Sequence, residues 1–524
     1  MKLVVLSILF FVASSFSSYA QSKKFNLKEK KKYWNAESLY LQGDYTEAIR
    51  GFESLKQLDP KFYELFYNLG DCYFALDRLE RSQSNLRIGA ELMTDAYFQM
   101  AYIKLYFGEL DSADYFIERF RKKRDENTKI RDFELKQLKS NISTARDLMG
   151  NGEVVNIINL GPAVNTKENE YVPLISSDEE LLLFTSKRKS DSPNLDANGN
   201  PFENVYYSTN LEAAYGWIEG KLLEGDVNTE KHDACVGLSP DGNILYLFRT
   251  NDNLIGGDLY ESLNLNGTWT TPVRMGNSIN GYGTVEPSAS ISLDGRTFYF
   301  SSNRAGGYGG FDLYQVKKLP NGEWSLALNL GETINTAFDE DAPFIHPDGK
   351  TLYFSSKGHT NMGGYDILKS ELDKGSWTKP TNLGYPTNST KNDIFFTISA
   401  NEKHGYYSSD KAGGFGGQDI YLIDYLEKNL RQSVISASVG SEEGIVASEI
   451  SLINTESGDL EGVYLTNSRT GKFIFLVNPN VEYELIIEAK GYEEHVEILN
   501  YTKEDLLNRQ KLNLKLTKSS YDVE

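Results

Sequence analysis

Length, composition and charge set the first limits on this chain. It has 524 residues, of which 40% are hydrophobic and 12% aromatic, so it can form several folded domains and is not a disordered chain. Its formal net charge of -20 at pH 7 repels nucleic acid and anionic membrane surfaces, and neither is expected as a partner. The two cysteines, Cys72 and Cys235, fall in different predicted domains, which argues against a structural disulfide.

The first twenty residues have the features of a secretory signal peptide. Lys2 precedes an apolar run from Leu3 to Val12, and small residues lead up to Ala20. The apolar run is shorter than the roughly 20 residues that a membrane-spanning helix needs. We therefore predict cleavage after Ala20 and no membrane span afterwards. No cysteine stands at the cleavage site, so no lipid anchor is expected.

Residues 29–148 are expected to be helical, because apolar residues recur there at helical spacing. Three equivalent positions, Tyr45, Leu79 and Leu110, are 34 and 31 residues apart. This spacing resembles the tetratricopeptide repeat of about 34 residues. Stacked helix pairs of that family form a solenoid that binds a peptide or a helix. A helical spacer that holds domains apart is the alternative.

Residues 151–425 change to a period-two strand pattern in repeated units. The phrases "GGDLY", "GGFDLY", "GGYDIL" and "GGQDIY" recur there, and Asp-Gly pairs separate alternating runs. A phosphate-binding loop is not favoured, because no Lys-Ser or Lys-Thr follows the glycines and strand residues come next. We interpret the glycines as turn residues that supply positive backbone φ angles between strands.

Four strands per unit are typical of a propeller blade. The first strand of each unit opens with an acid, which gives five units: Glu170, Asp233, Glu286, Glu340 and Asp393. We predict a five-bladed β-propeller, with six blades as the alternative if residues outside 151–425 contribute. The isolated strand expected at Val154 to Leu160 should complete the last blade by pairing with Asp419 to Ile423, which closes the ring.

These five acids are the candidate functional site, an acidic ring at one mouth of the central channel. Their mutual repulsion must be offset by a cation such as calcium, by a basic partner segment, or by hydrogen bonds to backbone amides. The five histidines show no metal-ligand spacing: His232, His346, His359, His404 and His495. No catalytic residue, metal site or cofactor is predicted. The run Asp339, Glu340 and Asp341 could hold calcium, but no regular oxygen-ligand loop follows it.

Two family resemblances extend this interpretation. "SPDG" at 239–242 and "HPDGKTLYFSS" at 346–356 resemble the WD40-like PD40 repeats of the TolB propeller. "TNSRTGKFIF" at 466–475 and "YELIIEAKGY" at 483–492 resemble the carboxypeptidase regulatory-like domain. That resemblance implies a small, non-catalytic, transthyretin-like β-sandwich at 433–518. The expected fold class is therefore multidomain: an all-α tetratricopeptide solenoid, an all-β propeller and a β-sandwich.

The order of these domains resembles the PorE group of periplasmic proteins associated with type IX secretion. Members usually continue into an OmpA-like domain that binds peptidoglycan, and this sequence ends at Glu524 without one, so direct peptidoglycan contact is not expected. The resemblance implies a periplasmic scaffold or adaptor at the outer membrane. Its helical repeats and propeller faces would bind outer-membrane or periplasmic proteins. A secreted or cell-surface location is the alternative.

Enzyme functions are the remaining alternatives. The sequence has no Gly-x-Ser-x-Gly elbow of a propeller-capped hydrolase, and it cannot place a carboxylate pair at a glycosidase separation. We therefore predict that the protein is not an enzyme. A glycan- or peptide-binding propeller module at the cell surface and a propeller hydrolase stay open as alternatives.

Overall fold

The computed structural model describes residues 24–519 except 77, 127, 177–178, 190–194, 196–200, 211–215, 253–255, 266, 426–431, 468–469 and 508–509. The predicted signal peptide, residues 1–20, lies outside the described residues. The chain divides into two compact units, Met1–Gly150 and Asn151–Glu524. Within the described part of the chain, no helix is long and apolar enough to cross a bilayer.

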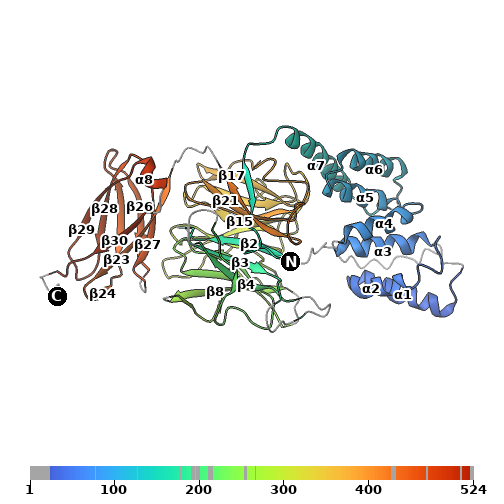
Figure 1. The fold of residues 1–524 in the computed structure, drawn as a ribbon, viewed down its shortest axis with the longest axis horizontal. Coiled ribbons are helices and arrows are strands. Elements are labelled where there is room, and N and C mark those ends of the chain that lie inside the picture. Colours follow the sequence, from blue (N-terminus) through green and yellow to red (C-terminus); the bar gives the residue numbers. More distant parts are fainter. Residues whose placement is uncertain are drawn as a thin grey trace. The chain divides into compact units, whose positions relative to one another are not determined.

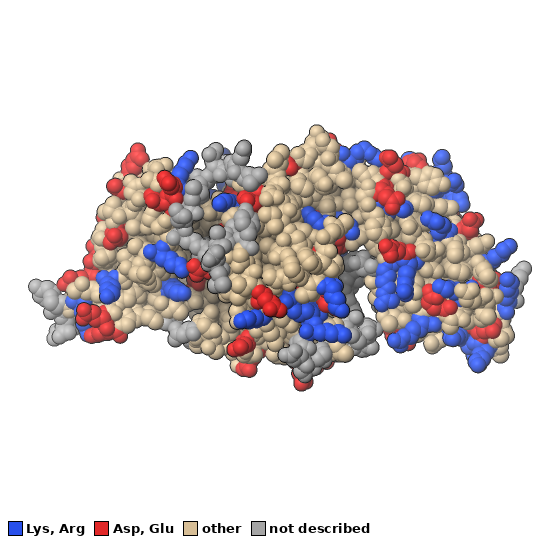
Figure 2. Space-filling model, viewed as in Figure 1, with Lys and Arg blue, Asp and Glu red and all other residues tan. Residues whose placement is uncertain are grey.

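The first unit consists of seven α-helices among its described residues (Figure 1): α1 (Leu27–Leu41), α2 (Tyr45–Glu53), α3 (Tyr63–Ala75), α4 (Leu79–Gly89), α5 (Asp95–Tyr106), α6 (Leu110–Lys123) and α7 (Asp132–Gly150). Helix α1 begins with a capping box, because the Asn26 side chain accepts the backbone N–H of Glu29 and the Glu29 carboxylate accepts that of Asn26. A Cβ on Gly89 would lie 2.8 Å from the Tyr67 nitrogen, so α3 and α4 pack closely. On the face shown in Figure 2, charged side chains of both signs are interspersed over this unit.

The predicted fold class, which began with an all-α tetratricopeptide solenoid, needs correction. The described residues hold eight α-helices and the chain is 21% helical, so the molecule is mainly β. The seven helices described in the first unit range from 9 to 19 residues. Helices α1, α3 and α5 start at Leu27, Tyr63 and Asp95, which are 36 and 32 residues apart. Apolar periodicity predicts amphipathic helices, but it sets neither their lengths nor a fixed repeat.

Five antiparallel sheets follow as the blades of a β-propeller. The first blade contains β2 (Glu170–Ile175), β3 (Leu181–Ser186), β4 (Asn204–Thr209) and β5 (Lys221–Leu222). The second contains β6 (Asp233–Leu238), β7 (Ile244–Thr250), β8 (Gly257–Leu265), β9 (Thr268–Trp269) and β10 (Val273–Arg274). The third contains β11 (Ala289–Ile291), β12 (Thr297–Ser302), β13 (Asp312–Lys317) and β14 (Leu328–Asn329). The fourth blade contains β15 (Glu340–Ile345), β16 (Thr351–Ser356), β17 (Asp366–Asp373), β18 (Ser376–Trp377) and β19 (Thr381–Asn382). The fifth contains β20 (Asp393–Ile398), β21 (His404–Ser409) and β22 (Asp419–Asp424), together with β1 (Asn156–Asn159).

Strand β1 closes the propeller ring. It pairs antiparallel with β22, with Asn156 opposite Asp424 and Asn159 opposite Tyr421. Ile158 packs against a cluster of buried side chains that includes Ile420 and Leu422 of β22. The predicted closure by the strand that precedes the first blade is therefore confirmed.

The repeated glycines pack one blade against the next. A Cβ on Gly309 would lie 2.0 Å from the carbonyl oxygen of Phe338, and one on Gly416 would lie 1.9 Å from that of Glu168. Both carbonyls belong to loops that lead into the following blade. The interpretation of these two glycines as turn residues is therefore corrected, because what requires glycine there is close backbone approach and not a positive φ angle.

The remaining strands form two sheets around one apolar core. One sheet contains β23 (Ser433–Ser441), β24 (Gly444–Ile445), β27 (Lys472–Val477) and β30 (Lys511–Lys515), and the other contains β25 (Glu449–Asn454), β26 (Leu460–Leu465), β28 (Glu482–Glu488) and β29 (His495–Asn500). Helix α8 (Lys503–Leu507) precedes β30. Ile435, Phe475 and Leu485 are fully buried between the sheets.

Candidate functional site

The five acids predicted to ring the channel mouth lie in the protein interior. All five residues are 0% exposed: Glu170, Asp233, Glu286, Glu340 and Asp393. Each stands at or just before the first strand of its blade, and its side chain points into the seam beside the loop that enters that blade. They do not form a solvent-exposed ring.

Each acid ties the entering loop to the second strand of its blade. Glu340 accepts hydrogen bonds from the backbone nitrogen and the Oγ1 of Thr336, at 2.7 and 2.8 Å, and from Ser356 Oγ at 2.7 Å. Asp393 repeats the arrangement with Ser389 and Ser409. The other partners are Thr166 and Ser186 for Glu170, Thr229 and Arg249 for Asp233, and Thr284 and Ser302 for Glu286. Hydrogen bonds to loop and strand thus offset the buried charge.

Burial changes the acidity of three of these carboxyl groups. Desolvation raises the pKa of Glu340 to about 8, against the opposing effect of its hydrogen-bond donors. Desolvation also raises the pKa values of Glu286 and Asp393. Arg304 lies 3.3 Å from Glu286, and Lys411 lies 3.7 Å from Asp393, and each cation lowers the pKa of its partner. Burial therefore partly suppresses the charge of Glu286, Glu340 and Asp393.

A second repeated residue, an asparagine, was missed by the sequence analysis. The side chain of Asn388 accepts the N–H of Ile367 at 2.8 Å and donates to its carbonyl at 2.8 Å, as a neighbouring strand residue would. Four more asparagines do the same for the third strand of a blade: Asn165, Asn228, Asn280 and Asn335. In four units the asparagine stands five residues before the acid, a spacing that could have revealed it.

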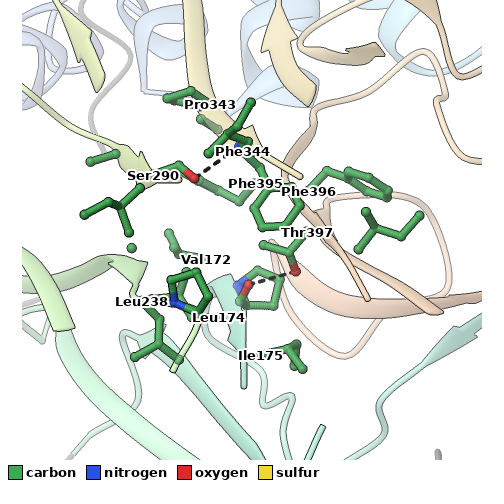
Figure 3. A pocket seen from close by; sticks show the side chains of 18 of the residues that line it. Val172, Leu174, Ile175, Leu238, Ser290, Pro343, Phe344, Phe395, Phe396 and Thr397 are labelled. Carbon is green, nitrogen blue, oxygen red and sulfur yellow. Dashed lines mark hydrogen bonds between the residues drawn. The ribbon is translucent and has the colours of Figure 1, made fainter. Parts of the chain in front are cut away.

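The first strands of all five blades converge on a pocket at the propeller axis, which we call the axial cup (Figure 3). Its volume is about 90 Å³. Val172, Leu174, Leu238, Phe344 and Phe395 supply much of its wall. The described lining contains no Asp, Glu, Lys, Arg or His. The cup is therefore a small, uncharged and mainly apolar cavity.

Backbone irregularities shape the axial cup. The pairing of first and second strands shifts register in four blades, and Val172, Ala342 and Phe395 have φ angles of 54°, 52° and 60°. Such left-handed residues cost of order 1–3 kcal/mol each, and bulges redirect side chains. Neighbouring blades bond to backbone near the bulges: Ser290 Oγ accepts the N–H of Ile345 at 3.1 Å, and Thr397 Oγ1 donates to the Pro173 carbonyl at 3.3 Å (Figure 3). The hydroxyls of Ser290 and Thr397 are thus already bonded, and most of the exposed wall is apolar.

The other sequence candidates lie apart from the cup. Four histidines pair with single carboxylates: His232 with Glu203, His346 with Asp348, His404 with Glu179 and His495 with Glu497. His359 bonds the carbonyl oxygen of Ile334. The described residues hold no group of three or more His, Cys, Asp or Glu that could bind a metal ion. Cys72 and Cys235 are both buried and free.

The fold and the axial cup define the chain as a β-propeller protein. No family model and no curated protein matches the sequence. Similar solved structures include an α-L-arabinofuranosidase from Lactobacillus brevis (11% identity, TM-score 0.32, 50% of this chain and 91% of that one), an exo-β-1,3-galactanase from Clostridium thermocellum (12%, 0.35, 66% and 86%) and an α-L-arabinanase from Penicillium chrysogenum (13%, 0.32, 52% and 99%).

These neighbours correct one sequence-based prediction. The protein was expected not to be an enzyme, and the three similar structures named above are glycosidases. That exclusion is therefore withdrawn. Identities of 11–13% with TM-scores of 0.35 or less assign neither a substrate nor a reaction to this chain.

Proposed function

We propose that the propeller is a binding module that holds a segment of a partner protein by inserting an apolar side chain into the axial cup. The observation that carries this proposal is the uncharged cup itself, to which the first strands of all five blades contribute. A cup of about 90 Å³ is small beside typical ligand pockets of roughly 300–1,000 Å³. It suits one side chain better than a whole small molecule.

The chemistry of the wall favours a peptide over a glycan. Sugar hydroxyls need free hydrogen-bond partners, whereas Ser290 and Thr397 already bond backbone groups. Glycoside hydrolysis needs two carboxylates beside the scissile bond, and the described lining has none. The bulged backbone keeps the cup in shape before a ligand arrives, which lowers the entropy cost of binding.

Our proposal also includes a location and a role. The predicted signal peptide, together with the propeller and the sandwich of the predicted domain order, motivates an adaptor exported to the periplasmic side of the outer membrane, within a type IX secretion or envelope-organising complex. An adaptor of that kind needs a module that grips a second protein, and the axial cup would be that module.

Photo-crosslinking in the producing cells tests the proposal. A benzophenone-bearing phenylalanine in place of Phe344 should capture a discrete protein, and the same group in place of Leu326, which is 86% exposed on the propeller, should not. Adding Leu238→Asp should abolish capture at position 344, because a carboxylate in an apolar wall repels an apolar side chain.

Other outcomes would replace the proposal. Capture of polysaccharide at position 344 would favour the glycan-binding module. Release of reducing sugar from arabinan or xylan by the full chain, lost in the Leu238→Asp variant, would favour a hydrolase. Equal protein capture with and without Leu238→Asp would remove the axial cup from the binding site.

A further inference from the structure

A second surface, on the sandwich, carries aliphatic side chains where an outer sheet face ordinarily carries polar ones. It is the outer face of the sheet β26-β25-β28-β29. Directly opposed residues form two rows across the four strands: Val463, Ser451, Ile486 and Val496, then Leu460, Ile453, Glu484 and Ile498. Leu465 lies beside them and is 64% exposed, and Leu460 and Ile498 are 59% and 55% exposed. We call this surface the aliphatic face.

The same sheet also supplies the sandwich core, so aliphatic side chains stand on both of its sides, although β28 also carries Glu484 and Glu488 on the outer side. Ile450, Leu452 and Leu485 point inward and are fully buried. An antiparallel sheet with one solvated face ordinarily carries polar residues on that face. A contiguous exposed apolar patch marks an interaction site on a soluble protein. The pattern therefore indicates a partner for the aliphatic face.

Negative charge on the aliphatic face favours a partner that carries positive charge. Glu449 on β25 lies directly opposite Glu488 on β28, and both are exposed. Like charges in directly opposed positions destabilise a sheet. Neither carboxylate has a hydrogen bond or ion pair with a described residue. Glu484 adds a third carboxylate to the face. A surface that covers the face must bring aliphatic side chains and at least one cation.

We propose that the aliphatic face docks a basic amphipathic helix of a partner protein. Its apolar stripe would lie on the aliphatic rows, and its lysines or arginines would reach Glu449 and Glu488. Four strands spaced about 4.8 Å apart give a surface wide enough for a helix of about 10 Å diameter. A second copy of this face would set the glutamate pair against itself, and an anionic membrane would be repelled. With the axial cup, the chain then has two separate binding surfaces.

Binding of designed peptides to the full mature protein tests this. The probe is an amphipathic helical peptide of leucine and lysine, and the matched probe has glutamate at every lysine position. We expect the leucine–lysine peptide to bind at least about tenfold more tightly. Leu465→Ser with Ile498→Ser should weaken its binding about tenfold, because it removes apolar contact area.

Replacing the glutamate pair separates docking from a structural role. Glu449→Gln with Glu488→Gln should weaken peptide binding about fivefold while the melting temperature stays the same or rises, because the repulsion is gone. Two control pairs should leave the affinity unchanged: Leu326→Ser with Leu328→Ser, and Glu456→Gln with Glu493→Gln. These control leucines are 86% and 61% exposed and lie on the propeller.

Four results would overturn the proposal. The first is equal binding of both peptides, and the second is wild-type affinity in either variant of the face. The third is a dimer in sedimentation that Leu465→Ser with Ile498→Ser dissolves, which would make a second copy the occupant. The fourth is a melting temperature lowered by several degrees in those variants, which would mean that the face is covered within the chain.

Discussion

Glu340 connects the loop that enters its blade to strand β16, and its contribution to stability depends on its protonation state. Its carboxyl accepts from Thr336 and Ser356 while burial raises its pKa from 4.5 to about 8. A carboxyl with a raised folded-state pKa contributes fully to stability below its unfolded pKa, near 4.5, and loses that contribution as pH rises to about 8. Glu286 and Asp393 shift in the same direction.

The first prediction compares melting profiles of the wild type and Glu340→Gln. Between about pH 5 and pH 9 the wild-type melting temperature should fall by roughly 4 °C more than that of the variant, because the amide cannot lose a proton. Thermal unfolding followed by circular dichroism measures both profiles. Glu323→Gln, at an exposed turn, should follow the wild type. Parallel profiles for the wild type and Glu340→Gln would contradict the raised pKa.

The second prediction concerns the glycines at the blade seams. Gly309→Ala should lower the stability by about 2 kcal/mol or more, because the new methyl group would meet the Phe338 carbonyl oxygen at 2.0 Å. Chemical denaturation measures the change. Gly276→Ala is the matched control, since a Cβ there meets nothing within 4 Å. Equal stability of the two variants would mean that the seam is not closely packed at Gly309.

At the scale of elements, local signals predicted well and contacts between elements did not. Period-two alternation and Asp-Gly turns, such as Gly295 with φ of 66°, are local and predicted the blade strands. The count of units then predicted the pairing of β1. The axial cup depends on bulges at Val172, Ala342 and Phe395, which arise where five strands meet. No single stretch of sequence encodes them, and the same reason hid the burial of the five acids.

The third prediction tests the closing strand. Ile158→Pro should lower the melting temperature by roughly 5 °C or more, because Ile158 stands at a hydrogen-bonded position opposite Leu422, where proline removes the donated N–H and leaves β22 as an open edge. Val154→Pro, ahead of β1 at a residue 92% exposed, should melt like the wild type. If the two variants melt alike, the pairing contributes little to closure.

At the scale of the whole molecule, the chain is two compact units, Met1–Gly150 and Asn151–Glu524, each with its own core. Helical periodicity predicted that residues 29–148 are helical, but the repeat family assigned to them depends on helix lengths and packing that periodicity does not contain. Buried side chains such as Phe52, Leu86 and Phe120 give the helical unit an interior of its own.

The fourth prediction follows from that division. A fragment of residues 24–150 should be helical by circular dichroism and should melt within about 5 °C of the helical transition in the full chain. A fragment that is largely unfolded would show that the helices depend on the second unit. The complementary fragment that begins at Asn151 should retain the β-rich spectrum of the propeller and sandwich.

The closing strand also makes the propeller sensitive to mechanical load. Helix α7 ends at Gly150, shortly before β1, and the sandwich begins at Ser433, shortly after β22. Because Asn156 lies opposite Asp424, both connections leave the ring from the same end of that pair. Tension between the helical unit and the sandwich would peel β1 from β22 one residue pair after another, and not shear all pairs together. If partners held the chain at both ends, a pulling force would thus first separate the short strand β1 from β22.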